Sequence, residues 1–351
     1  QKPVIRNLLR MSVYQLKYMD QVPDSAVCNE AVRLAQKKGF GTLKGFVNGV
    51  LRSIARGIEE ISFDDLSICY STPQWIVDQW VEEYGKDKAV RMLADQYAEK
   101  PVTIRINETK TTKQQLKARL ESEGVTVQEV DGMDCALAIS GFDYLRALSS
   151  FREGLFHVQD LSSQQCAAAL AVRPGHRVLD VCSAPGGKSF TLAEMMQNTG
   201  SLLAMDLYPN RLKLVEDGAA RLGLTCLQVR PGDARIFDKS LGTFDRILCD
   251  VVCSGYGVIR RKPEIRYKDP AECDALPQTQ LAILAASARY LTPGGRLVYS
   301  TCTLNPAENE GVVQQFLRET PGYALCGQPV TTLPRQTAGD GFFYAVLERT
   351  E

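Results

Sequence analysis

The hydrophobic positions of this chain follow a helical period toward the amino end and a more varied pattern after it. From Gln1 to about Gly57, apolar residues recur at spacings of three and four, which predicts a small helical domain. The helical period continues through Ile61–Tyr97, so we interpret residues 58–100 as a helical connector. The chain starts inside this pattern without a methionine, and we expect that an earlier part of the protein is missing from the sequence.

The segment 101–156 carries shorter and mixed patterns. Val102–Arg105 predicts a strand, residues 113–123 a helix, and residues 125–130 and 136–139 two more short strands. Together these elements predict a small α+β domain.

From His157 onward, strand patterns alternate with helical ones, which is typical of βαβ units and a parallel sheet. The expected strands are 177–181, 202–206, 225–229, 246–250 and 296–300. A late strand at 342–347 is expected to pair antiparallel at the end of the sheet. We therefore predict an α/β fold whose main part is a Rossmann-like domain over residues 157–351.

The composition narrows the class of protein. Lys plus Arg and Asp plus Glu both number 41, so a binding site for a polyanion has to be a local patch. The 11 cysteines include no CxxC pair and the chain has only two histidines, which argues against a zinc finger or a disulfide framework and favours reduced thiols in the cytosol. No apolar run approaches the roughly 18 residues of a membrane span. We expect a soluble, cytoplasmic protein without a metal.

A glycine-containing turn, Ala184-Pro185-Gly186-Gly187-Lys188, follows the predicted strand at 177–181 and opens a helix. Backbone N–H groups at such a turn suit a nucleotide-like ligand. Acidic residues end three strands in succession, at Asp206, Asp233 and Asp250. The turn is neither GxGxxG nor GxxxxGK[ST], so S-adenosylmethionine, which has a ribose and an adenine but no phosphate, fits better than a dinucleotide or a triphosphate. In the alternative interpretation the aspartates are turn or cap residues.

Two cysteines follow predicted strands of the same sheet. Cys253 lies in Asp250-Val251-Val252-Cys253-Ser254-Gly255, and Cys302 in Tyr299-Ser300-Thr301-Cys302-Thr303. Because the carboxyl ends of parallel strands line one crevice, we expect the two thiols to face one pocket. A single free cysteine is commonly a small core residue, and that remains the alternative for either of them alone.

With these motifs in order, the chain resembles the bacterial Sun-type 16S ribosomal RNA (cytosine-C5) methyltransferases. The matching pieces are Asp180–Lys188, Asp206 with Arg211, Asp233, Asp250–Gly255, Arg260–Glu264, Thr301–Glu310 and Asp340–Phe343. The resemblance implies an S-adenosylmethionine-dependent methyltransferase domain. It also implies that residues 1–57 are the second half of a NusB-like, RNA-binding helical domain. Arg105 and Asn107 match a pattern in the small middle domain of the family.

The resemblance also implies roles for the residues of the site. Cys302 is the nucleophile that adds to C6 of cytosine and makes C5 reactive, and Cys253 is a base or proton relay. Asp250 would hydrogen-bond the cytosine edge, and Lys188 would orient Asp250. The residues expected to bind the cofactor are Cys182, Ser183, Ala184, Pro185, Gly186, Gly187, Lys188, Asp206, Arg211, Asp233 and Asp250.

A cluster of basic residues follows the first of these cysteines: Arg260, Arg261, Lys262, Arg266 and Lys268. A run of this length is often only a solvated loop, but its place beside the pocket favours contacts with RNA phosphates. A target base in folded RNA would have to be flipped out to reach the thiols.

One departure from the family and several alternatives affect the functional prediction. The family usually has proline before the first cysteine, where this chain has Val252. The favoured function is methylation of cytosine C5 in small-subunit ribosomal RNA. The alternatives are the same reaction on transfer RNA, a non-catalytic RNA-binding assembly factor, and, on fold alone, a nicotinamide-dependent oxidoreductase.

Overall fold

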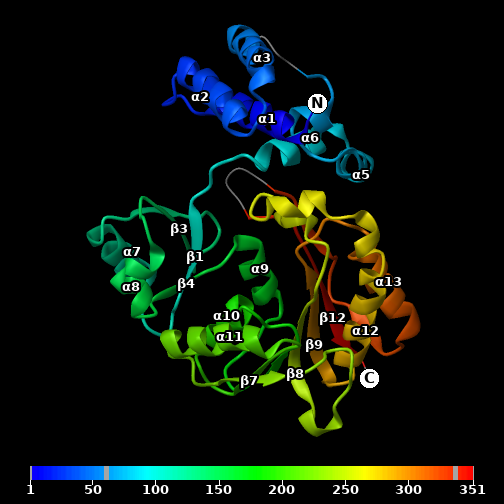
Figure 1. The fold of residues 1–351 in the computed structure, drawn as a ribbon. Coiled ribbons are helices and arrows are strands. Elements are labelled where there is room, and N and C mark those ends of the chain that lie inside the picture. The colour runs from blue at the N-terminus through cyan, green and yellow to red at the C-terminus, as the bar shows by residue number, and fades with distance from the viewer. Residues whose placement is uncertain (1, 59–62, 335–338, 351) are drawn as a thin grey trace. The chain divides into compact units, whose positions relative to one another are not determined.

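The computed structural model describes residues 2–58, 63–334 and 339–350. It divides into two compact units, Gln1–Ser71 and Thr72–Glu351 (Figure 1). The first unit is helical, as the sequence predicted, with α1 (Pro3–Tyr18), α2 (Asp24–Lys37), α3 (Lys44–Gly57) and the short α4 (Leu66–Cys69). The apolar stripes of α1, α2 and α3 meet in one core, which buries Ile5, Leu8, Cys28, Ala31, Val47 and Leu51.

The second unit begins with two packed helices, α5 (Gln74–Tyr84) and α6 (Lys86–Asp95), which bury Trp80 and Met92. The segment that the sequence suggested as a connector, 58–100, is thus shared between the two units. The predicted domain boundaries remain predictions.

A small four-stranded sheet follows, in the order β2-β3-β1-β4. Its strands are β1 (Val102–Ile106), β2 (Thr126–Glu129), β3 (Ala136–Ser140) and β4 (Phe156–Val158), and β1 pairs antiparallel with both of its neighbours. Its helices are α7 (Lys113–Ser122) and α8 (Ser149–Arg152). A capping box between Thr112 and Gln115 begins α7. This is the predicted α+β domain.

The larger sheet has eight strands, seven of them in the order β10-β12-β9-β8-β5-β6-β7, with β11 beside β12. The strands are β5 (Arg177–Asp180), β6 (Ser201–Asp206), β7 (Leu227–Pro231), β8 (Phe244–Asp250), β9 (Leu291–Thr301), β10 (Tyr323–Leu325), β11 (Val330–Thr332) and β12 (Phe342–Arg349). Strands β7, β6, β5, β8 and β9 run parallel, and β12 is antiparallel to β9.

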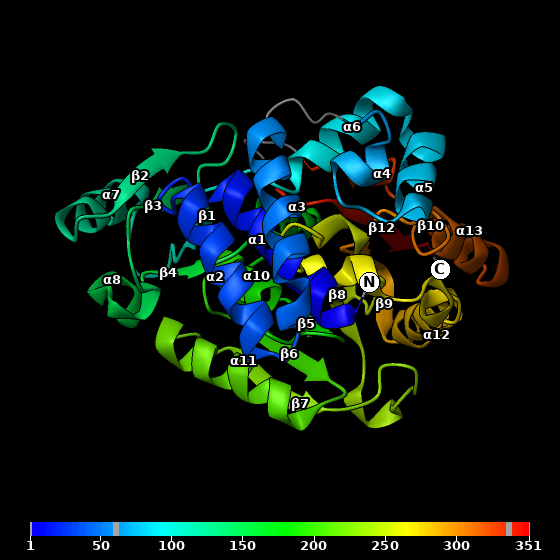
Figure 2. The same ribbon diagram turned by 45° about the horizontal axis from the view of Figure 1, so that its top comes forward.

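Helices cover both faces of this sheet, as Figures 1 and 2 show. α9 (Leu161–Ala169), α10 (Gly187–Met195) and α11 (Pro209–Leu222) lie on one side, and α12 (Leu276–Ala288) and α13 (Glu310–Glu319) lie on the other. This confirms the predicted Rossmann-like class. One detail was wrong: the late strand β12 does not end the sheet, because β10 pairs with its outer edge.

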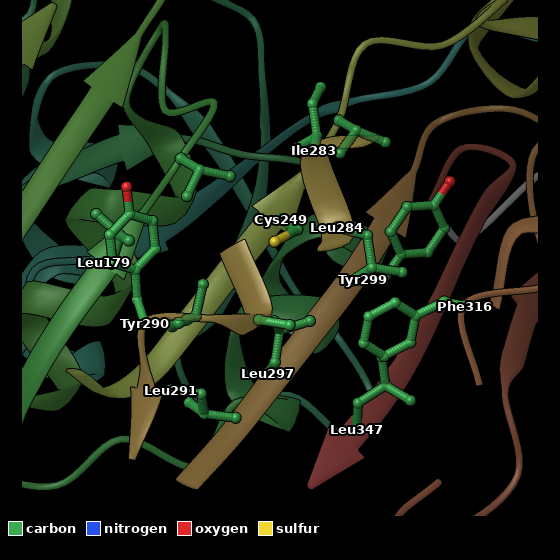
Figure 3. Close-up of a cluster of buried hydrophobic side chains, with 14 of the residues drawn as sticks. Leu179, Cys249, Ile283, Leu284, Tyr290, Leu291, Leu297, Tyr299, Phe316 and Leu347 are labelled. Carbon is green, nitrogen blue, oxygen red and sulfur yellow. The ribbon is translucent and has the colours of Figure 1, made fainter. Parts of the chain in front are cut away.

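The core on the α12 side of the sheet contains one cysteine among aliphatic and aromatic side chains. Figure 3 shows Cys249 beside Leu284, in the same cluster as Tyr299, Phe316 and Leu347. Burial raises the pKa of the Cys249 thiol to about 12. Cys249 is therefore an inert packing residue, although it lies only four positions before Cys253.

Candidate active site

The turn between β5 and α10 is held in a fixed shape by its glycine and by one backbone hydrogen bond. Gly186 has φ +110°, and a Cβ there would lie 2.4 Å from the Phe190 ring, so only glycine fits. The backbone N–H of Ser183 donates to the carbonyl of Met205 at 2.7 Å. The predicted cofactor loop, including Pro185 and Gly187, thus lies against the end of β6.

Asp206 and Arg211 hold the same loop from the next strand. Asp206 is buried and its carboxylate accepts hydrogen bonds from the backbone N–H groups of Ala184 and Tyr208, at 3.3 and 3.0 Å. Arg211 lies 3.3 Å from Asp206 and donates to the carbonyl of Ala184 at 2.6 Å. Asp206 and Arg211 therefore fix the loop. A ligand hydroxyl that donated to Asp206 would share its carboxylate with the N–H groups of Ala184 and Tyr208.

Two other residues of the predicted cofactor set, Asp233 and Ser183, differ in whether their polar atoms already have hydrogen-bond partners. Asp233 is already paired with Arg235, whose guanidinium donates to both carboxylate oxygens at 2.9 and 2.6 Å, and these hydrogen bonds lower the pKa of Asp233. Arg235 was not among the residues predicted for the site, although it lies only two positions away. Ser183 is the opposite case, because its hydroxyl is buried and finds no partner among the described residues. Beside it, burial raises the pKa of the Cys182 thiol well above its usual range.

An ion pair joins α10 to the end of β8. The ammonium of Lys188 lies 2.7 Å from Asp250, whose other oxygen accepts the Ser300 hydroxyl at 2.8 Å. Burial lowers the pKa of Lys188, but the adjacent Asp250 together with the thiols of Cys166 and Cys302 more than offsets this, so the net shift is upward. The ammonium also lies 4.9 Å from the centre of the Phe342 ring. The structure thus places Lys188 in contact with Asp250, and its role in orienting Asp250 stays a prediction.

The two predicted thiols lie side by side. The sulfur atoms of Cys253 and Cys302 are 3.3 Å apart, and both side chains are partly accessible. The hydrogen bond from Cys253 lowers the pKa of Cys302, and the ammonium groups of Lys188 and Lys262 act in the same direction. The same hydrogen bond raises the pKa of Cys253, and burial adds to that effect. Cys302 is thus the better thiolate and Cys253 the neutral donor.

Two glycines allow three chain segments to meet beneath the thiols. A Cβ on Gly257 would lie 2.1 Å from the Gly341 carbonyl oxygen and 2.8 Å from that of Cys302. The backbone N–H of Gly257 donates to the Cys302 carbonyl, and that of Gly341 donates to Gly257. The loops that carry Cys253 and Cys302 are therefore packed directly against the start of β12.

The basic cluster near the site is partly neutralised. Arg261 pairs with Asp160 at 2.9 Å and with Asp340 at 2.6 Å, and Arg260 lies 3.4 Å from Asp340. The prediction was wrong for Arg266, which is buried and donates to the Tyr97 hydroxyl. Lys262 and Lys268 are exposed.

A cavity of about 830 Å³ lies beside these charged residues. Lys100, Thr103, Asp160, Gln165, Arg260 and Arg261 are among the residues that line it. The cavity borders both the small sheet and the larger one, since Thr103 lies on β1 and Thr331 on β11. No sequence pattern indicates this cavity, because it depends on how the two sheets pack.

Among the residues that the structure describes, no group of three or more His, Cys, Asp or Glu side chains is arranged to hold a metal ion. Within the described ranges, no helix is both long and apolar enough to cross a membrane.

The sheet order and the loop-to-helix turn define a methyltransferase of Rossmann-like fold, and solved structures agree. A methyltransferase homolog protein from Pyrococcus horikoshii superimposes with a TM-score of 0.70 at 27% identity, over 81% of this chain and 98% of its own. NSun6 from the same organism, solved with SFG, has the same fold, with a TM-score of 0.71 at 21% identity over 80% of this chain and 98% of its own.

The chain belongs to the 16S rRNA methyltransferase RsmB/F family, whose model matches residues 167–348. The NusB family model matches residues 1–56, and the ferredoxin-like domain model of the RsmF/B-like methyltransferases matches residues 72–142. The probable ribosomal RNA small subunit methyltransferase B of Bacillus subtilis is 39% identical, over 92% of this chain and 74% of its own length. A relative from Enterobacter, ribosomal RNA small subunit methyltransferase B, is 35% identical over 98% of this chain and 82% of its own. The protein is thus an RNA methyltransferase.

Proposed function

We propose that the protein methylates C5 of a cytosine in small-subunit ribosomal RNA, with S-adenosylmethionine as the methyl donor and Cys302 as a covalent nucleophile. The observation that carries this proposal is the pair of thiols, 3.3 Å apart, in the loops after two neighbouring parallel strands. The names of the relatives support the choice of ribosomal RNA.

The first half of the reaction needs a thiolate, because C5 of cytosine is a poor nucleophile. Cys302 is suited to this role, since its hydrogen bond from Cys253 lowers its pKa. Its sulfur adds to C6, and the electrons of the C5=C6 double bond make C5 able to take up a methyl group. Asp250 lies beside the thiols with its second oxygen held by Ser300, and it would accept a hydrogen bond from the cytosine amino group.

The loop after β5 fits S-adenosylmethionine. The buried Ser183 hydroxyl lacks a partner among the described residues, the start of α10 presents backbone N–H groups, and Asp206 lies at the end of the next strand. When bound there, the cofactor would supply an electrophilic methyl group. Ser183, Gly187 and Asp206 would hold it. The structure of NSun6 with SFG, an S-adenosylmethionine analogue, supports this choice of cofactor.

The second half of the reaction needs a base for the C5 proton. Cys253 is held as a thiol mainly by its hydrogen bond to Cys302. Once Cys302 has become a thioether, that restraint is removed, and Cys253, which is partly accessible, can release its proton to water and then, as a thiolate, take the proton on C5. The electron pair of the C5–H bond re-forms the C5=C6 double bond, and the C6–S bond breaks to return the Cys302 thiolate.

Contacts with RNA are proposed on two surfaces. Lys262 and Lys268 are exposed in the loop that follows Cys253, where they can meet phosphates. The cavity beside Arg260 and Arg261 opens next to the same loop and is large enough for a nucleotide. The NusB-like unit would add affinity and select the RNA.

The test is methyl transfer from labelled S-adenosylmethionine to unmodified small-subunit ribosomal RNA, with total transfer RNA as the second substrate. We expect 5-methylcytosine in ribosomal RNA, no product with Cys302→Ala, and a trapped protein–RNA adduct with Cys253→Ala. If 5-methylcytosine forms only in transfer RNA, the substrate is transfer RNA and not ribosomal RNA. RNA binding without any methylation would favour an assembly factor and reject the proposal.

A further inference from the structure

A buried carboxyl group, that of Glu308, is hydrogen-bonded to the residue that follows Cys253. Glu308 is in the loop between β9 and α13 and is fully buried. One of its oxygens accepts from the hydroxyl of Ser254 and the side-chain amide of Asn305, and the other from the backbone N–H of Ser254 and the amide of Gln280. Three of these hydrogen bonds measure 2.9 Å and the fourth, from the Ser254 hydroxyl, 2.5 Å.

These donors come from three separate parts of the chain. Ser254 directly follows Cys253, Gln280 is on α12, and Asn305 is in the loop that carries Cys302. Within the described part of the chain, Glu308 forms no ion pair with a cationic side chain, so its charge is balanced by hydrogen bonds alone. Burying a carboxylate in this way is unfavourable unless every acceptor is satisfied. The structure accepts that cost in the region where the two cysteine loops meet.

The same network holds the backbone on both sides of Cys253. The amide of Gln280 donates to the carbonyl of Val252 as well as to Glu308, both at 2.9 Å. Ser254 is fixed by Glu308 and by the Thr303 hydroxyl, 2.7 Å away. Residues 252 and 254 are thus anchored by one connected set of side chains. The family usually has proline, which has a more rigid backbone, at the position of Val252. In this chain the hydrogen bond from Gln280 holds the Val252 carbonyl instead.

Cys253 depends on this anchoring more than Cys302 does. Cys302 follows β9 directly, and the register of β9 is fixed by β8 on one side and β12 on the other. Cys253 comes three residues after the end of β8, in a stretch without regular structure. Its position relative to Cys302 is therefore set mainly by side-chain hydrogen bonds.

We propose that Glu308 is a positioning residue that, through Ser254 and Gln280, holds the Cys253 thiol against Cys302 for the second half of the reaction. This inference rests on the proposed function above. It assigns Glu308 to proton removal and adduct release, and leaves the attack of Cys302 on the base largely independent of it.

The test compares adduct formation with turnover in Glu308→Gln. Glutamine keeps the volume, but its NH₂ group opposes an N–H donor of Ser254, Gln280 or Asn305, so the Cys253 loop should shift. Turnover should fall about a hundredfold, as is usual for misplacement of a reacting group by about 1 Å. The covalent protein–RNA adduct should still form and should accumulate. In a protein that already carries Cys253→Ala, adding Glu308→Gln should cause little further loss of turnover, because Glu308 acts only through Cys253.

Controls separate this role from a structural one. Glu310→Gln removes a carboxylate two positions away and should leave both adduct release and the melting temperature near those of the unchanged protein. If Glu308→Gln does not fold, Ser254→Ala removes the Glu308 and Thr303 contacts of the hydroxyl and should show the same accumulation of adduct. The proposal would be overturned if Glu308→Gln lowered turnover and adduct formation equally. It would also be overturned if Glu308→Gln left turnover unchanged. A lack of methylation in the unchanged protein would instead reject the proposed function itself.

Discussion

The sulfur atoms of Cys253 and Cys302 lie 3.3 Å apart although the residues are 49 positions apart in the sequence. One hydrogen bond between them lowers the pKa of Cys302 and raises that of Cys253. The two thiols are thus made unequal by each other, before any substrate is bound.

Replacement of Cys253 by alanine should shift the titration of Cys302 to higher pH. The variant loses the hydrogen bond that is the largest cause of the lowered pKa of Cys302. The rate of alkylation of Cys302 by iodoacetamide, followed by peptide mass spectrometry against pH, should then rise at a higher pH than in the unchanged protein. Cys69→Ala, which removes an exposed cysteine, serves as the control. An unmoved curve in Cys253→Ala would show that the hydrogen bond does not set this pKa.

Replacement of Asp250 by asparagine should destabilise the second unit. Lys188 keeps its charge in a largely buried site without its partner, and the free energy of unfolding should fall by about 1 to 3 kcal/mol, less than for a fully buried pair because Asp250 is partly exposed. Urea unfolding measures this. Asp217→Asn, from the exposed pair with Lys213, should have no measurable effect. Equal stability of the two variants would contradict the importance of the buried pair.

The stability of the fold should depend on pH through Asp180. Burial raises the pKa of this carboxyl to about 7, whereas an unfolded chain has about 3.9. Between these values the folded state binds a proton that the unfolded state has released, so stability falls as pH rises from about 4 to about 7. Asp180→Asn cannot lose a proton there. It should therefore match the unchanged protein near pH 4 and exceed its stability at pH 8, by at most about 4 kcal/mol.

Thermal unfolding in buffers from pH 4 to pH 8 decides this point. The quantity to compare is the difference between Asp180→Asn and the unchanged protein, because other groups titrate in both. A difference that does not change with pH would mean that Asp180 is ionised throughout.

Loss of Lys262 and Lys268 should weaken RNA binding in a salt-dependent way. Both side chains are exposed in the loop after Cys253. If each contacts one phosphate, replacing both by glutamine should reduce the slope of log K against log salt by about 1.4, the value for two contacts with single-stranded RNA. Filter binding at several salt concentrations measures the slope. Lys213→Gln, an exposed lysine that already pairs with Asp217, should leave it unchanged.

The sequence predicted six of the eight strands of the large sheet, β5 to β9 and β12, because each contains a short run rich in apolar residues; the three-residue strands β10 and β11 were missed. The predicted strand at 246–250 lies within β8, and the one at 202–206 within β6. The strand expected at 225–229 begins two residues late, at Leu227, since residues 225 and 226 form a turn. Local pattern was enough for these elements, but it could not place β12 inside the sheet, because strand order depends on long-range pairing.

The partners of the candidate site residues were harder to predict. Gln280 and Ser254 reach Glu308 across 28 and 54 positions, and no local pattern indicates such contacts. The buried pair of Arg105 on β1 and Glu194 on α10, 3.0 Å apart, was missed for the same reason, although Arg105 was noted for its motif. Arg266 resembled its exposed neighbours in sequence and differs only through its packing on Tyr97. The roles of the site residues themselves remain predictions.

The position of β12 has a consequence for how the protein is made. Gly341 contacts Gly257, which in turn contacts the Cys302 carbonyl, and Phe342 lies against Lys188, so the start of β12 helps to hold both cysteine loops and Lys188. A ribosome synthesises this strand after both cysteine loops. Until residues 341–349 have left the exit tunnel, the nascent chain holds two reactive cysteines without the scaffold that sets them against each other. We therefore expect the growing polypeptide to be inactive toward the ribosomal RNA of the particle that is translating it.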